Sequence, residues 1–256
     1  MESVLVKDLA VANALRRVIL QDLTGVAPTS VKFLSNTSLM SEEMIAFSLA
    51  WCAMKSEQPK GKFVFKQSNK DSKGYRSVRC LHAESDAATF VDPQLPLLKL
   101  APGESVHAEV DYAPGLGRDH CKFCRATRVA CKPADGKVNL EVQLVDPDDS
   151  NVTAQAISTL FSMINSVTNS APDWQDTSWT WQTAGATCCA LLQEMAGRLL
   201  PVANTAILTS EEATLRCTSQ KQEYLRQAQQ AVTAACAEIT QSLDSLKIRR
   251  SENSQF

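Results

Sequence analysis

Apolar residues recur every three or four positions in several segments of the chain, which is the spacing of a helix with one buried face. The longest repeat predicts a single helix over residues 221–246, and its stripe reads Leu225, Ala228, Val232, Ala235, Ile239, Leu243 and Leu246. Shorter repeats predict helices over residues 9–21, 152–167 and 186–200. Ser41, followed by two glutamates, indicates the N-terminus of a further helix, because serine caps the free N–H groups and acids suit the first turn.

Alternation of apolar and polar residues predicts strands between these helices. The alternation is clearest from Val138 to Leu144, and the two tryptophans at 179 and 181 continue the pattern in a later segment. Shorter candidates lie at residues 31–34, 62–66, 78–82 and 213–218. Pro28 is expected to end the first helical region. Helices and short strands in this arrangement predict an α+β fold.

The character of the chain changes twice, and these changes predict its domains. Residues 58–137 are polar and rich in proline and glycine, and residues 169–173 look like a linker. The parts on either side share one plan: a helix, short strands, then a long amphipathic helix. We therefore predict a first half formed by residues 1–56 and 136–170, a mostly β insert at 57–135, and a second half at 171–256.

Composition limits the classes of function. The chain has 256 residues, 44% hydrophobic and 21% charged, which is ordinary globular usage, and no apolar run is long enough for a membrane span. Its net charge of −2 argues against an electrostatic DNA binder as a whole. Nine cysteines and an N-terminus without signal-peptide character indicate free thiols in a reducing compartment.

Candidate chemistry is sparse. Cys121 and Cys124 form half of a zinc motif, but no second C-x2-C follows, so structural thiols are favoured over a metal site. No G-x-S-x-G, P-loop or H-E-x-x-H sequence occurs. We therefore expect no catalytic residue, no cofactor and no metal. The enzyme alternative is a cysteine-dependent hydrolase that uses His107 or His120 as its base.

A cluster of basic residues between positions 60 and 79 is opposed only by Asp71. It consists of Lys60, Lys62, Lys66, Lys70, Lys73, Arg76 and Arg79. Such a run is usually a solvated face, and the alternative is an electropositive patch for nucleic acid or an acidic partner. Few aromatic residues interleave with the cluster, so single-strand binding is disfavoured.

Three segments carry a resemblance to a known family. Val11-Ala12-Asn13-Ala14-Leu15-Arg16-Arg17-Val18-Ile19-Leu20 closely resembles the first helix of the α-like subunits of cellular RNA polymerases, namely bacterial α, archaeal D and the third-largest subunit of eukaryotic polymerase II. The residues from Ser35 to Ala46 resemble the strand end and acidic second helix of that family. Gly115-Leu116-Gly117-Arg118-Asp119-His120-Cys121-Lys122-Phe123 is similar to its G-x-G-x-D/E-H-A-K-W loop.

This resemblance implies a non-catalytic assembly platform that binds the two largest subunits of a DNA-directed RNA polymerase and meets DNA only through the complex. The residues implied in partner binding are Asn13, Leu15, Arg16, Arg17, Glu42, Glu43, His120 and Lys122. The alternative that remains open is a stand-alone scaffold outside transcription.

The second half resembles the small partner of that family, archaeal L or the eleventh subunit of polymerase II, in its long last helix and in Thr183 and Gly185. One chain holding both partners resembles the polymerases of nucleocytoplasmic large DNA viruses, which implies a location in the nucleus or, for a viral protein, in the cytoplasm and virion. The implied fold is an intramolecular pseudo-heterodimer. Its half–half interface is expected at Leu160, Met163, Leu225, Val232, Ile239 and Leu243.

Overall fold

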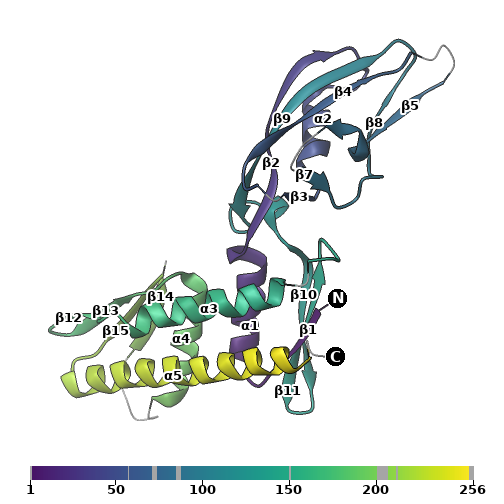
Figure 1. The fold of residues 1–256 in the computed structure, drawn as a ribbon. Helices are drawn as coiled ribbons and strands as arrows, with labels where there is room; N and C mark the ends of the chain where they lie inside the picture. Colours follow the sequence, from purple (N-terminus) through teal and green to yellow (C-terminus); the bar gives the residue numbers. More distant parts are fainter. Residues whose placement is uncertain are drawn as a thin grey trace. The chain divides into compact units, whose positions relative to one another are not determined.

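The chain forms two compact units in the computed structural model (Figure 1). Unit 1 comprises residues 1–23 and 126–256, and unit 2 comprises residues 24–125. The structure describes residues 2–56, 58–70, 74–84, 88–149, 151–200, 207–211 and 213–253. All strand pairs among them are antiparallel, and the fold mixes helices with several small sheets.

Unit 1 begins with a three-stranded sheet in the order β1-β11-β10, formed by β1 (Glu2–Val6), β11 (Lys137–Leu144) and β10 (Ala126–Ala134). The alternation that predicts β11 is confirmed, since Leu140 and Val142 have no exposed surface. β1 and β10 lie outside the predicted strands. β1 is too short to show a period, and the apolar residues of β10 are mostly only half-buried.

The first helix, α1 (Leu9–Arg17), begins where the Asp8 carboxylate accepts the N–H of Ala10 at 2.6 Å. A π-helical turn, η1 (Val18–Asp22), extends it over the rest of the predicted segment. The helices α3 (Val152–Thr168), α4 (Ala186–Leu199) and α5 (Gln222–Asn253) confirm the other helical repeats of this unit.

A second sheet in unit 1 has the order β12-β13-β15-β14. Its strands are β12 (Asp173–Gln175), β13 (Ser178–Gln182), β15 (Thr214–Thr218) and β14 (Ile207–Glu211). Trp179 on β13 is fully buried, and its indole N–H donates to the carbonyl of Leu225 at 2.9 Å. This bond fixes the sheet to the first turn of α5.

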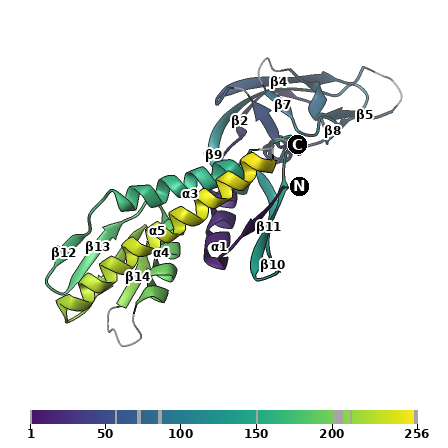
Figure 2. The same cartoon turned by 60° about the horizontal axis from the view of Figure 1, so that its bottom comes forward.

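One hydrophobic core serves the whole of unit 1, with buried residues from α1, α3, α4, α5 and both sheets. Helices α3 and α5 pack against each other and run side by side in both ribbon views (Figures 1 and 2). The residues expected at a half–half interface all lie in this core: Leu160, Met163, Leu225, Val232, Ile239 and Leu243. The segment expected to be a linker is also bonded into the unit, because the Trp181 indole donates to Ser170 Oγ at 2.8 Å.

Unit 2 is built on a sheet in the order β2-β9-β4-β6, formed by β2 (Thr24–Asn36), β9 (Ser105–Leu116), β4 (Gly61–Ser68) and β6 (Ala83–Glu84). Two small ladders join β3 (Met54–Ser56) to β7 (Ala88–Phe90) and β5 (Arg76–Arg79) to β8 (Pro96–Leu100). Helix α2 (Glu42–Ala50) contacts β2 and β8 and covers a separate core.

Two local predictions for unit 2 are wrong in extent. β2 is far longer than the expected strand at 31–34 and contains Pro28, which sits at a shift in register where its missing N–H is tolerated. Residues 80–82 form a 3-10 turn, η2 (Cys80–His82), in place of a strand. The compact unit also begins at residue 24 and ends at 125, whereas the expected insert spans 57–135. The long pairing of β2 with β9 draws residues 24–36 into unit 2.

Candidate protein interface

Helix α1 presents one polar edge and buries most of its other residues, with Leu9 at its start 53% exposed. Asn13 and Arg16 are half-buried and Arg17 is exposed. Leu15 has 0% of its surface exposed and belongs to the core of unit 1. Direct partner contact by Leu15 therefore does not fit the structure. The residue anchors α1 and so holds its neighbouring arginines in place.

The two arginines of α1 carry charges that no described residue neutralises. Neither Arg16 nor Arg17 makes a hydrogen bond or ion pair among the parts of the chain that the structure describes. Beside them, Asn13 Oδ1 lies 3.9 Å from the thiol of Cys131 on β10. Burial raises the pKa of that thiol, and the nearby Arg16 charge acts against this shift. Guanidinium groups placed this way suit carboxylates supplied by another protein.

Helix α2 carries the second group of predicted residues. Ser41 caps it by accepting the N–H of Met44 at 3.4 Å, which confirms the predicted helix start. Glu42 and Glu43 follow in the first turn and are exposed, where the positive end of the helix dipole stabilises their charge. Ile45 and Leu49 are buried in the core of unit 2.

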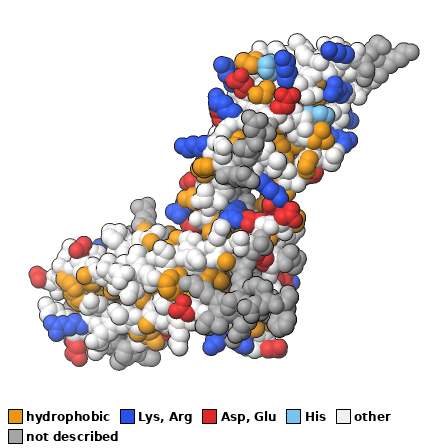
Figure 3. Space-filling model, in the orientation of Figure 1, with side chains coloured by type: hydrophobic (Ala, Val, Ile, Leu, Met, Phe, Trp, Pro, Cys, Tyr) orange, Lys and Arg blue, Asp and Glu red, His pale blue; other side chains and the backbone are white. Residues whose placement is uncertain are grey.

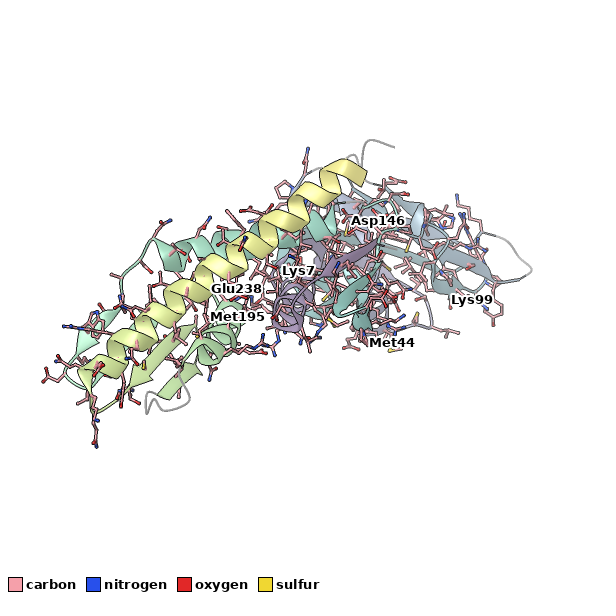
Figure 4. All side chains as sticks on the ribbon, turned by 90° about the horizontal axis from the view of Figure 1, so that it is seen from below. Lys7, Met44, Lys99, Asp146, Met195 and Glu238 are labelled. Carbon is pink, nitrogen blue, oxygen red and sulfur yellow. The ribbon has the colours of Figure 1, made fainter. Side chains whose placement is uncertain are left out.

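The side of α2 that faces away from the core of unit 2 carries exposed apolar residues. Met44, which Figure 4 labels, is 54% exposed, and Phe47 and Trp51 are 62% and 50% exposed. The rings of Phe47 and Trp51 meet edge to face with centroids 6.0 Å apart, and the His120 ring lies 5.6 Å from Trp51. Exposed aromatic groups of this kind are typical of protein interfaces. Cys52, the residue after Trp51, is buried.

The turn η3 (Cys121–Phe123) places His120 and Lys122, and both have internal partners. His120 Nδ1 accepts the N–H of Lys122 at 3.1 Å, and Lys122 Nζ donates to the carbonyl of Pro28 at 2.7 Å. His120 is exposed and contacts Trp51, so it belongs to the α2 surface. The ammonium of Lys122 is already used to hold η3 against β2.

Two glycines leave room for Phe123, the last residue of the loop sequence. Gly25 and Gly115 face each other across β2 and β9. A Cβ on Gly115 would stand 2.6 Å from the Phe123 ring, and one on Gly25 would stand 2.0 Å from the Phe123 carbonyl oxygen. The glycines therefore allow η3 to pack onto the sheet and so position His120.

The cysteines offer little reactive chemistry. Cys121 is exposed and its sulfur lies 3.9 Å from His120 Nδ1. Burial raises the pKa of the Cys124 thiol, and it raises the pKa of Cys188 to about 12 and that of Cys217 to about 11. Among the described residues, no three His, Cys, Asp or Glu side chains come together as metal ligands.

The structure brings the predicted residues into two surfaces. The α1 surface consists of Asn13, Arg16 and Arg17 on unit 1. The α2 surface consists of Glu42, Glu43, Met44, Phe47, Trp51 and His120 on unit 2. Sequence reasoning missed Met44 and Phe47, although α2 has apolar residues on both sides and only one side can face a core.

Comparison with known proteins finds several relatives of this chain. No family model matches the chain. It is 31% identical over 127 residues to a protein of Pyrococcus horikoshii named DNA-directed RNA polymerase subunit Rpo3, a match that covers 44% of this chain and 48% of that protein. Its relatives are named as RNA polymerase subunits. They include Rpo3 of Methanocaldococcus jannaschii, 24% identical over 52% of this chain and 69% of the relative.

A eukaryotic relative extends this pattern. The chain is 24% identical to the Saccharomyces cerevisiae protein named DNA-directed RNA polymerases I and III subunit RPAC1, over 45% of this chain and 48% of that protein. The chain thus spans about half the length of most of these curated relatives. Within the described residues, no helix has both the length and the apolar character that crossing a membrane requires.

Proposed function

We propose that this protein is a non-catalytic assembly subunit of a DNA-directed RNA polymerase, which binds the two largest subunits and holds no active site itself. The observation that carries the proposal is the α1 surface. Its helix resembles the first helix of the α-like subunits, and the charges of Arg16 and Arg17 have no partner among the described residues. The names of its relatives support the same role.

The α2 surface supports a second contact. Its exposed aromatic rings lie beside the acids Glu42 and Glu43, which gives an apolar centre with a charged rim, as in protein interfaces. We assign this surface to a large subunit as well. The second half, residues 171–256, takes the place of the small partner of the α-like subunits. The nine free cysteines of the chain suit a reducing compartment, in the nucleus or, for a viral protein, in the cytoplasm and virion.

Purification from the native source tests the proposal. A tagged wild-type chain should recover the two largest polymerase subunits, and Arg16→Ala with Arg17→Ala should strongly reduce recovery of the second-largest one. Interface arginines often dominate binding, whereas surface arginines contribute little to folding, so the thermal unfolding midpoint should stay close to that of the wild type.

The matched control is Arg128→Ala with Arg226→Ala, because both of these arginines are exposed on unit 1 outside the α1 surface. It removes the same charge and should leave recovery unchanged. If the wild type recovers other proteins and no polymerase subunit, the stand-alone scaffold is the correct function. Equal recovery with both double variants would remove the α1 surface from the proposal.

A further inference from the structure

The end of unit 2 that carries β5 and β8 gathers basic side chains. Figure 3 shows lysine and arginine side chains over this end, with some acidic ones beside them. The described members are exposed and are named here the basic end: Lys66, Lys70, Arg76, Arg79 and Lys99. Lys73 and Asp71, from the same stretch of sequence, lie outside the described residues.

A buried asparagine holds two elements of the basic end together. Asn69 is 2% exposed, and its amide N–H groups donate to the carbonyls of Gly74 at 3.0 Å and Leu100 at 2.9 Å. The residue after it is Lys70, and the residue before Leu100 is Lys99, which Figure 4 labels. The loop after β4 and the end of β8 are therefore held beside each other.

The arginines are held in position by neutral groups. Arg76 donates to the Ser68 carbonyl at 2.8 Å and to Gln67 Oε1 at 3.0 Å, and Arg79 donates to Gln94 Oε1 at 2.5 Å. These bonds reduce the freedom of both guanidinium groups without cancelling their charge. An arginine fixed in this way loses less entropy when it binds an anion.

The charges of the basic end are not compensated by the described acids. None of its five cations makes an ion pair within the described part of the chain. Two carboxylates of unit 2 each accept a backbone N–H, Glu104 that of Ala101 at 2.7 Å and Asp92 that of Gln94 at 2.9 Å, and neither forms an ion pair with these five cations. By contrast, Lys62 on the same strand as Lys66 pairs with Asp111 at 3.3 Å.

An aromatic side chain completes the arrangement. Tyr75 is 72% exposed and directly precedes Arg76. Proteins that bind single strands combine cations for the phosphates with an exposed ring on which a base can stack. We propose that the basic end binds the phosphate backbone of a single-stranded nucleic acid, with one base stacked on Tyr75. This activity goes beyond assembly, and it requires no other polymerase subunit.

Single strands fit this surface better than the two other polyanions. An acidic protein segment would use the cations, but its carboxylate side chains offer no planar base to stack on the ring of Tyr75. A DNA duplex keeps its bases stacked inside, where a tyrosine outside the helix cannot reach their faces. A flexible single strand offers both phosphates and bases.

The test measures binding of the full chain to a labelled 20-nucleotide oligo-U and oligo-dT by fluorescence anisotropy from 20 to 200 mM salt. With up to five phosphate contacts, the plot of log affinity against log salt should have a slope of about −3. In the triple variant Lys66→Gln, Lys70→Gln, Lys99→Gln, this slope should be less negative by about 2. Tyr75→Ala should weaken binding about 5- to 150-fold with little change in slope.

The control variant Lys7→Gln, Arg128→Gln, Arg226→Gln removes three exposed charges from unit 1 and should bind as the wild type does. Circular dichroism checks that each variant is folded. Equal losses with both triple variants would overturn the proposal, because the effect would then follow net charge alone. Binding of poly-glutamate as tight as that of the oligonucleotides would assign the surface to an acidic protein, and a preference for duplex DNA would remove the role of Tyr75.

Discussion

Unit 1 should unfold as one cooperative body even though its residues come from the two halves expected from the sequence. Leu160 lies on α3 in the expected first half, and Ile239 lies on α5 in the second. Both side chains have no exposed surface and belong to one core. Replacing either with alanine removes buried carbon atoms and leaves a cavity, at a cost of about 2–5 kcal/mol.

The size of the effect makes the two variants easy to measure. For a unit of 150 residues or slightly more, 1 kcal/mol corresponds to about 2–4 °C in the unfolding midpoint, so each variant should lower it by roughly 4–20 °C. Fluorescence of the buried Trp179 and Trp181 reports this transition within unit 1. Urea titration gives the same free energies of unfolding independently.

Matched controls lie beside the two positions. Ser158 on α3 and Glu238 on α5 are exposed, and changing either to alanine should alter the free energy of unfolding by less than about 0.5 kcal/mol. Leu160→Ala and Ile239→Ala should move the same transition. Two separate transitions within unit 1, each moved by only one of the variants, would refute the single core and make the halves independent domains.

Two further predictions concern unit 2. Gly115→Ala should destabilise unit 2 by about 1–3 kcal/mol, because the new Cβ meets the Phe123 ring. The control Gly197→Ala on α4, where nothing lies within 4 Å of the new Cβ, should stabilise unit 1 by about 0.5–1 kcal/mol. Equal effects of the two substitutions on thermal unfolding would count against this account. In the native chain, iodoacetamide should label Cys121 first because it is exposed, at a rate close to that of free cysteine, and Cys121→Ser should abolish that phase. Labelling of Cys121 much faster than that of free cysteine at neutral pH would instead favour the cysteine-hydrolase alternative, because His120 lies 3.9 Å from its sulfur.

Residue patterns alone predict the helices of unit 1 well, because their apolar stripes are long. The repeat from Leu225 to Leu246 corresponds to a stripe that is buried throughout on α5. Strands are harder to find. β9 spans 12 residues, and its first part alternates buried Val106, Ala108, Val110 and Tyr112 with polar residues, a signal that the prediction missed. Only its end, which contains Pro114 and Gly115, reads as a loop. Its pairing with β2 depends on contacts far apart in the chain, which a local pattern does not contain.

The candidate site is predictable only in part, for a related reason. A pattern can place Leu15 and Arg16 on one helix, but only packing shows that Leu15 is buried while Arg16 keeps an edge exposed. The internal bond of Lys122 to Pro28 joins residues 94 positions apart and leaves no trace in either local sequence. The resemblance to α-like subunits supplies candidate residues, and the structure separates those that face outward from those that support the fold.

The position of the α1 surface depends on residues from the second half. Arg198 on α4 pairs with the Asp8 carboxylate at 2.8 Å, and Asp8 caps the start of α1. α1 also packs against α4, and its buried side chains share the core with α5. Because both halves are on one chain, the effective concentration of one for the other is in the millimolar range or higher, so α1 is fixed without a separate binding step. The partner binding proposed for Arg16 and Arg17 is therefore coupled to the folding of residues 171–256, although none of those residues need touch the partner.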